Sequence, residues 1–162
     1  MLIGVISDTH GYFDARLDAA FEGVDAIVHA GDVGSVTVLE ALRRIAPVHA
    51  VQGNNDVPLG GLGLTAHLDL ELAGCKVHVV HEVVNARPAA DTNVVILGHS
   101  HACVSEDRNG VLYLNPGAAG RRGFHRLQTV ALLRVEAGRV EATLVELGPR
   151  IAVVRQTRSL TA

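Results

Sequence analysis

Aromatic residues are scarce in this sequence: they make up 3% of the 162 residues, and tryptophan is absent. The hydrophobic core must therefore consist mainly of Val, Leu, Ile and Ala. Proteins that bind single-stranded nucleic acid stack the bases on aromatic side chains, so the scarcity argues against that class. The formal net charge of −3 gives no overall positive field for a polyanion. We therefore expect no nucleic-acid polymer as a partner, and an anionic substrate would need local positive charge, such as metal ions.

Cysteine and long apolar runs are also rare. Cys75 and Cys103 are far apart and form no CxxC pair, so we expect two reduced, buried thiols of a cytosolic protein. No apolar run approaches the roughly 20 residues of a membrane span. The apolar N-terminal segment lacks a basic lead and reaches Asp8 too early for a signal peptide. These features predict a cytoplasmic protein without a membrane partner.

The remaining composition is that of a folded protein, with 48% hydrophobic and 19% charged residues. A chain of this length suggests one domain, which can bury roughly 70% of its unfolded surface. We place a single domain at residues 1–150 and a polar tail at 151–162.

The order of the apolar segments predicts an α/β fold. The first third of the chain is typical of strand, helix, strand, helix and strand at residues 2–7, 12–21, 26–29, 36–45 and 48–51. This order implies a parallel sheet with right-handed crossovers.

Short strands and turns dominate the rest of the chain. The Gly-rich residues 59–64 are expected to form a loop, and residues 83–92 at most one helical turn. Asn109-Gly110 is a strong hairpin signal. Further strands are expected at 66–72, 76–80, 93–97, 102–106, 111–114, 130–135 and 140–145. The predicted fold is two packed, mixed β-sheets flanked by helices.

Five predicted strands are each followed by Asp, Asn or His. These residues are Asp8, His10, Asp32, Asn54, His81, His99 and His101. Because ligands bind at the carboxyl ends of strands in open α/β sheets, we expect the side chains to meet at one edge. Glycines stand beside three of these positions, where we expect the backbone to turn sharply.

Each of these residues alone has an ordinary explanation. Asp8 and Asp32 could cap the segments that follow them, residues 53–56 could form an Asx-turn loop, and His81 could be a hydrogen-bonded histidine at a strand end. Their convergence favours a metal site. Nitrogen and oxygen ligands without thiolate suit a divalent first-row ion such as Mn, Fe, Ni or Zn. Seven ligands exceed the four of a structural zinc site and fit two ions that share Asp32.

The ordered motifs resemble those of the calcineurin-like metallophosphoesterase superfamily. Within it, the chain is similar to the small bacterial and archaeal phosphodiesterase branch, to which the retromer vacuolar-sorting scaffold is related. The family pattern DxH, GD, GNxD, H and GHxH is matched by Asp8-Thr9-His10, Gly31-Asp32, Gly53-Asn54-Asn55-Asp56, His81 and Gly98-His99-Ser100-His101. The segment Asn115-Pro116-Gly117-Ala118 is similar to the NPGS turn of that branch.

The resemblance implies a metallophosphoesterase α/β sandwich with two divalent ions, manganese being favoured. One ion would be held by Asp8, His10, Asp32 and His101, and the other by Asp32, Asn54, His81 and His99. A hydroxide that bridges the ions would attack the phosphorus atom of a small phosphoester. We count Asn54, Asp56 and His99 as catalytic: Asn54 could donate a hydrogen bond to the substrate phosphate, and Asp56 would orient its loop.

The chain departs from the family pattern at two positions. Many members have His where Asn55 stands, and Asn55 cannot supply a proton to the leaving group at neutral pH. This favours diesters or activated esters. Glu82 stands where the family usually has Gly, and we expect it to face solvent, although it could lie near the metals. Asn55 and Arg121 are candidate substrate residues, with a solvated loop as the alternative for Arg121.

The predicted function is therefore hydrolysis of small phosphoesters, with phosphodiesters favoured. The alternative is a catalytically weak, metal-binding scaffold for protein–protein interaction, like the retromer subunit. The presence of all seven ligand residues favours the enzyme. The edges of the hairpins could pair with another chain, which leaves a homo-oligomer open.

Overall fold

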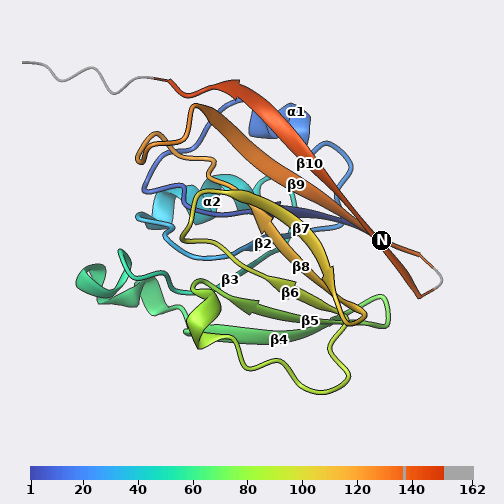
Figure 1. The fold of residues 1–162 in the computed structure, drawn as a ribbon. Coiled ribbons are helices and arrows are strands. Elements are labelled where there is room, and N and C mark those ends of the chain that lie inside the picture. Colours follow the sequence, from blue (N-terminus) through green and yellow to red (C-terminus); the bar gives the residue numbers. More distant parts are fainter. Residues whose placement is uncertain (137, 152–162) are drawn as a thin grey trace, which may run out of the picture.

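A computed structural model describes residues 1–136 and 138–151 of the chain. Its strands are β1 (Leu2–Ile6), β2 (Ala26–His29), β3 (Val48–Ala50), β4 (His67–Leu72), β5 (Cys75–Val80), β6 (Val94–Ile96), β7 (Cys103–Arg108), β8 (Val111–Pro116), β9 (Leu127–Glu136) and β10 (Arg139–Pro149). They form two five-stranded sheets with the orders β10-β9-β1-β2-β3 and β4-β5-β6-β8-β7. The predicted architecture of two mixed sheets is confirmed (Figure 1).

Each sheet has a parallel centre with antiparallel strands beside it. In the first sheet β1, β2 and β3 are parallel, and the hairpin β9–β10 joins antiparallel to β1. In the second sheet β5, β6 and β8 are parallel, while β4 and β7 complete two hairpins. The hairpin predicted at Asn109-Gly110 is therefore present as β7–β8. Because parallel strands point the same way, each sheet brings several carboxyl ends to one edge.

Two apolar layers hold the sandwich together. The layer between the sheets is aliphatic, as the composition predicts, and includes Val5 and Val28 from the first sheet with Val79 and Ile96 from the second. The other face of the first sheet packs against α1 (Leu17–Ala20) and α2 (Val36–Arg43). The fully buried side chain of Phe21 belongs to this second layer. The predicted helices thus cover the first sheet (Figure 1).

The first helix is shorter than predicted. Its spacing predicts a helix over 12–21, but α1 spans only Leu17–Ala20. A carboxylate oxygen of Asp14 accepts the backbone N–H of Arg16 at 3.0 Å, and the Arg16 guanidinium donates to Asp14 and to the Leu147 carbonyl oxygen in β10 at 2.7 Å. Local side-chain-to-backbone hydrogen bonds of this kind compete with helix formation. The segment is therefore tied to the sheet instead of continuing the helix.

Other differences from the predictions are local. Residues 59–63 of the expected loop lie within a 3₁₀ helix, η1 (Val57–Gly63), a form common in short connectors. The single helical turn expected within 83–92 is η2 (Val83–Asn85). Cys75 is buried as expected, but Cys103 is exposed, which corrects that prediction. Most of the polar tail predicted at 151–162 lies outside the described residues.

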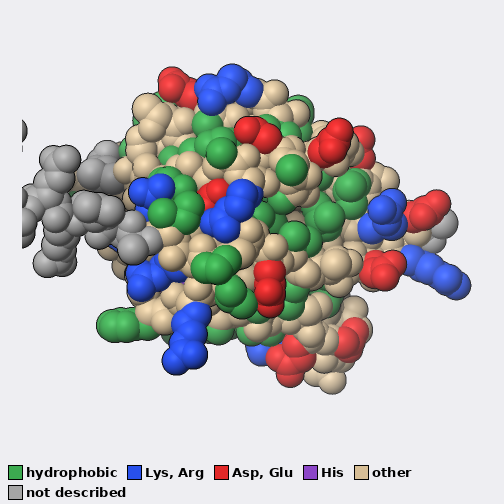
Figure 2. All heavy atoms as spheres, turned by 90° about the horizontal axis from the view of Figure 1, so that it is seen from above, with side chains coloured by type: hydrophobic (Ala, Val, Ile, Leu, Met, Phe, Trp, Pro, Cys, Tyr) green, Lys and Arg blue, Asp and Glu red, His purple; other side chains and the backbone are tan. Residues whose placement is uncertain are grey.

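Charges of both signs are mixed on the surface beside β10. Figure 2, which views the molecule from above, shows Lys and Arg side chains interspersed with Asp and Glu on the described part of that face. A basic stripe, the electrostatic mark of a surface that binds a nucleic-acid polymer, is not seen there. Among the described residues, none of the helices is long and apolar enough to cross a membrane.

Candidate metal centre

The seven predicted ligand residues meet at one end of the sandwich. Asp8 and His10 follow β1, Asp32 follows β2 and Asn54 follows β3, whereas His81 follows β5 and both His99 and His101 follow β6. The first four therefore come from one sheet and the last three from the other. The prediction of a single sheet edge is wrong in this respect, because two edges face each other across the site.

One half of the cluster joins Asp8, His10 and His101. The Nε2 atom of His101 lies 3.2 Å from Asp8 Oδ1 and 3.3 Å from His10 Nε2. The candidate ligand atoms of these three residues all lie within 4.8 Å of one another. They are close enough to bind one metal ion together.

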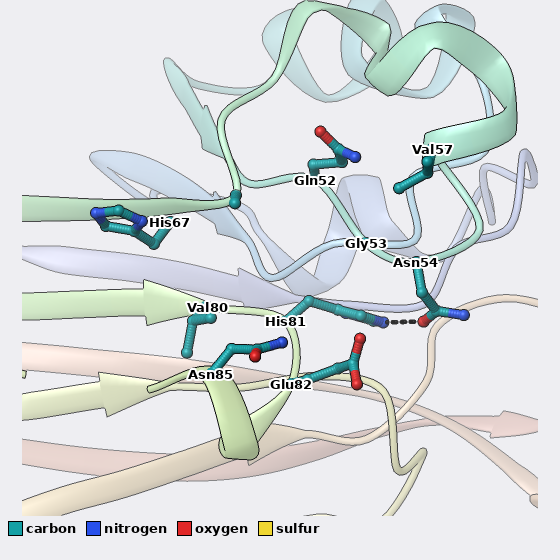
Figure 3. Close-up of a pocket in the computed structure, with 10 residues that line it drawn as sticks. Gln52, Gly53, Asn54, Val57, His67, Val80, His81, Glu82 and Asn85 are labelled. Atoms are coloured by element: carbon teal, nitrogen blue, oxygen red, sulfur yellow. Dashed lines mark hydrogen bonds between the residues drawn. The ribbon is translucent and has the colours of Figure 1, made fainter. Parts of the chain in front are cut away.

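The other half joins Asp32, Asn54, His81 and His99. His81 Nε2 lies 3.5 Å from Asp32 Oδ2 and 3.1 Å from Asn54 Oδ1, a contact drawn in Figure 3. His99 Nδ1 lies 3.1 Å from the same Asn54 oxygen. Asp8, Asp32 and His81 form a second group whose ligand atoms lie within 4.8 Å. Because Asp32 Oδ2 is also 3.9 Å from His10 Nδ1, Asp32 stands between the two halves.

Asp8 supplies a test of whether a metal ion fits here. Its side chain is fully buried, and among the described residues its Oδ1 atom has no hydrogen-bond partner. Its Oδ2 atom accepts hydrogen bonds from the Ser7 hydroxyl and from the His99 backbone N–H. A buried, unpaired carboxylate oxygen is costly unless a cation satisfies it. The donor set of two carboxylates, histidine nitrogens and an amide oxygen therefore fits a divalent first-row ion.

The backbone of the ligand residues is strained. The φ angles of Asp8 (55°), His10 (48°), Asp32 (55°), His99 (66°) and His101 (57°) are all positive. This left-handed region costs a non-glycine residue on the order of 1–3 kcal/mol, and such residues cluster at functional sites. The sharp turns that we expected at the glycines are thus made in large part by the ligands themselves.

Two of the neighbouring glycines serve close packing instead. Gly53 and Gly98 have no positive φ angle. A Cβ atom on Gly98 would lie 2.6 Å from the Ala30 carbonyl oxygen, and one on Gly53 would overlap Asp32. Only glycine lets these backbones approach the ligand turns so closely.

Hydrogen bonds favour the ligating form of Asp32. Burial raises the pKa of its carboxyl group, but hydrogen bonds with His81 and Asn55 outweigh burial and hold the pKa well below its usual range. The backbone N–H of Asn55 donates to Oδ1 at 2.8 Å, and its side-chain amide donates to Oδ2 at 2.5 Å. Burial also lowers the pKa of His10, which favours its neutral imidazole. An ionised carboxylate and a neutral imidazole are the forms that bind metals.

Further contacts orient the ligands. The Nδ1 atom of His81 lies 2.7 Å from the Ala30 carbonyl oxygen; when it donates this hydrogen bond, Nε2 is free to face the cluster. Asp56 is fully buried and accepts the backbone N–H groups of Val33, Gly34 and Gly53. These bonds join the Asp32 turn to the Asn54 loop. They support the predicted role of Asp56 in orienting the loop.

The two candidate substrate residues have partners within the protein. Asn55 donates to both oxygens of Asp32, so it supports that ligand. The guanidinium of Arg121 lies over the ring of Tyr12, 3.6 Å from its centroid. Neither residue is among the seven clustered ligands.

Sequence reasoning missed the supports that come from distant segments. The side-chain amide of Asn115 donates to the Gly98 carbonyl oxygen at 2.7 Å and to Ser100 Oγ at 3.1 Å, which holds the turn that carries two histidine ligands. The ring of His125 packs edge-on against His101, with centroids 5.2 Å apart. The NPGA segment was the one available signal for Asn115, and nothing local marks His125.

Fold and site together define an α/β sandwich protein with a candidate metal centre between its two sheets. Residues 1–138 match the calcineurin-like phosphoesterase superfamily domain, and the chain belongs to this superfamily. The predicted family is thereby confirmed. The chain is 39% identical over 134 residues to a probable metallophosphoesterase of Methanocaldococcus jannaschii. The aligned region covers 73% of this chain and 68% of that protein.

Solved structures show the same fold at lower identity. An archaeal phosphodiesterase superposes with a TM-score of 0.71 at 24% identity, covering 90% of this chain and 100% of that one. A Vps29 of Entamoeba histolytica superposes with a TM-score of 0.71 at 20% identity, covering 90% and 99%. The archaeal phosphodiesterase and the Vps29 protein thus share the arrangement of the two sheets with this chain.

Proposed function

We propose that this protein is a metal-dependent phosphoesterase that hydrolyses small phosphodiesters at a site for two ions. The observation that carries the proposal is the buried Oδ1 atom of Asp8, which makes no hydrogen bond among the described residues and lies at the junction of two overlapping ligand groups. Asp8, Asp32, His10 and His101 would hold one ion, and Asp32, Asn54, His81 and His99 the other. Manganese is favoured among the ions that such ligands accept. The name of the sequence relative, a probable metallophosphoesterase, supports the reaction class.

Two ions bound by these residues would supply positive charge for the phosphoryl oxygens and would activate water as the nucleophile. The protein orients the phosphate through Asn54. Because Asn54 Oδ1 contacts both His81 and His99, its amide nitrogen is left to donate. In Figure 3 this nitrogen points away from His81. It can therefore donate a hydrogen bond to a phosphate oxygen.

Asn55 narrows the choice of substrate. Its side-chain amide already donates to Asp32, and an amide releases no proton at neutral pH. Proton transfer to a leaving group must therefore come from elsewhere. Diesters and activated esters, whose leaving groups are less dependent on a proton donor, remain the favoured substrates. The mixed charges in Figure 2 and the net charge of −3 support small substrates over nucleic-acid polymers.

The test combines metal analysis with turnover of bis-p-nitrophenyl phosphate. We expect two equivalents of metal, activity that a chelator removes, and recovery with Mn²⁺. His99→Ala should lose one ion and lower the rate a hundredfold or more, beyond the roughly 10–100-fold of residues that only orient ligands. His49→Ala, in β3 and outside the ligand cluster, is the matched control. A protein that binds two ions but hydrolyses no phosphoester above background would disprove the proposal.

The alternative, a metal-binding scaffold, has weaker support. Its structural basis is the likeness to Vps29, which at 20% identity shows the fold alone. The left-handed backbone of the ligand residues serves metal binding in either function. The reaction class in the name of the sequence relative favours the enzyme.

A further inference from the structure

A pocket opens beside the Asn54–His81 end of the metal centre (Figure 3). It has a volume of about 410 Å³ and is lined in part by Gln52, Asn54, Val57, His81, Glu82 and Asn85. Two of these six residues belong to the candidate metal centre, so a group bound in the pocket would lie next to a phosphate held there. The pocket is large enough for one ester group of a small substrate.

Glu82 is the one carboxylate among the described residues of this pocket. Figure 3 shows its carboxylate directed toward the Asn54–His81 pair, and the residue is only partly exposed. Of the two positions considered for Glu82, in solvent or near the metals, this placement favours the second. Although Glu82 precedes η2, its side chain makes no capping hydrogen bond there. Its oxygens, which can only accept hydrogen bonds when ionised, are available to a ligand.

The other walls of the pocket combine carboxamide, imidazole and apolar groups. Gln52 and Asn85 carry carboxamides, which both donate and accept hydrogen bonds. Val57, on η1, is 58% exposed and presents an apolar surface to the pocket (Figure 3). No Lys or Arg occurs among the described residues that line it. A second phosphate in this pocket would meet the Glu82 carboxylate with no Lys or Arg to offset the repulsion, and the imidazoles there are His67 and the candidate ligand His81, which disfavours it.

We propose that this pocket binds the sugar ring of one ester group, with Glu82 accepting hydrogen bonds from two neighbouring hydroxyls. An uncharged sugar supplies donors for Glu82, partners of either kind for Gln52 and Asn85, and an apolar ring face for Val57. A carboxylate that accepts a ribose hydroxyl is a recurrent device in nucleotide-binding proteins. The inference rests on the proposed function for the position of the phosphate, and it adds the class of the esterified group.

The test measures binding without turnover. Uridine and 2′-deoxyuridine, which differ in one hydroxyl of the diol, are titrated into ¹⁵N-labelled protein. Uridine should shift the amide signals of Gln52, Glu82 and Asn85. Its Kd should be lower than that of 2′-deoxyuridine by about tenfold, the value of one hydrogen bond to a charged group. Glu82→Gln should bring the two Kd values within about twofold, whereas Glu40→Gln, an exposed control on α2, should keep the preference.

Turnover of bis-p-nitrophenyl phosphate, which has no hydroxyls, separates this inference from the proposed function. We expect Glu40→Gln to leave that rate within about twofold of the unsubstituted protein. If the diester is hydrolysed but both nucleosides bind equally, the pocket assignment fails and the enzyme stands. If uridine is preferred through Glu82 but no phosphoester is hydrolysed, the pocket assignment stands and the proposed enzyme activity fails. If Glu82→Gln lowers metal content together with turnover, Glu82 belongs to the metal centre and the sugar assignment is overturned.

Discussion

Replacing Asp8 with Asn should stabilise the metal-free protein and abolish its stabilisation by metal. One oxygen of Asp8 accepts hydrogen bonds from Ser7 and from the His99 backbone, while the other has no partner among the described residues and lies 3.2 Å from His101 Nε2. Asn keeps an oxygen for the first two donors. It also places an N–H group where the unpaired oxygen was, and a neutral His101 can accept its hydrogen bond.

The expected effect of Asp8→Asn on the free energy of unfolding differs between the metal-free and the metal-bound protein. Removing a buried, unsatisfied acceptor should raise the free energy of unfolding in EDTA by about 1–3 kcal/mol. Metal at 100 times its Kd should raise that of the unsubstituted protein by about 2.7 kcal/mol, because it binds only the folded state. This gain corresponds to a rise in Tm of roughly 5–10 °C for a domain of this size. Asp8→Asn should show little of that rise, so its advantage in EDTA should fall by about 2.7 kcal/mol on adding Mn²⁺.

The assay is thermal unfolding at pH 8, followed by circular dichroism in EDTA and in MnCl₂. Asp32→Asn is a matched control, because Asn55 donates to both oxygens of Asp32. An amide nitrogen there would face a donor, so that variant should lose about 1–3 kcal/mol even in EDTA. The reasoning is refuted if Asp8→Asn is the less stable protein in EDTA, or if Mn²⁺ raises the Tm of both proteins equally.

Two further predictions concern supports outside the ligand set. Asn115→Ala removes one donor to the Gly98 carbonyl oxygen, which keeps the Ser100 backbone N–H, and leaves the buried Gly117 N–H without its acceptor. We expect a loss of about 1–3 kcal/mol in urea unfolding and at least tenfold weaker Mn²⁺ binding by titration; an unchanged Kd would contradict this. The side-chain hydrogen bond from Arg16 holds the pKa of Asp14 below its usual range. The ion pair therefore stabilises the fold fully above the unfolded pKa of about 4, and this stabilisation is lost as the pH falls through the lower pKa of the folded state. Asp14→Asn should therefore be less stable at pH 7, with the difference from the unsubstituted protein shrinking below about pH 4; a constant difference in urea unfolding between pH 7 and pH 2 would count against it.

The parts of the fold that follow from local pattern were predictable. Continuous apolar runs and turn dipeptides indicated the strands, and the polar residues after each strand indicated the ligands. Long-range hydrogen bonds were not predictable, because no local pattern marks them. The bond from Arg16 to Leu147 joins residues 131 positions apart and limits α1 to one turn. The bond from Asn115 to Gly98 likewise depends on β6 and β8 being neighbours in the second sheet.

The geometry of the ligands was also beyond the sequence, and it explains why the site should depend on metal. Left-handed φ angles at Asp8 and His99 place their side chains in the gap between the two sheets, at a cost in backbone strain. Glycine would avoid this strain, but it has no side-chain atom that could bind a metal. Burial of Asp8 adds the cost of an unpaired oxygen. A bound cation offsets both costs at once, because it satisfies the oxygen and links ligands from the two sheets. The metal-free protein should therefore be weakest where β1 and β6 end, and chelation should loosen that end of the sandwich before its aliphatic core.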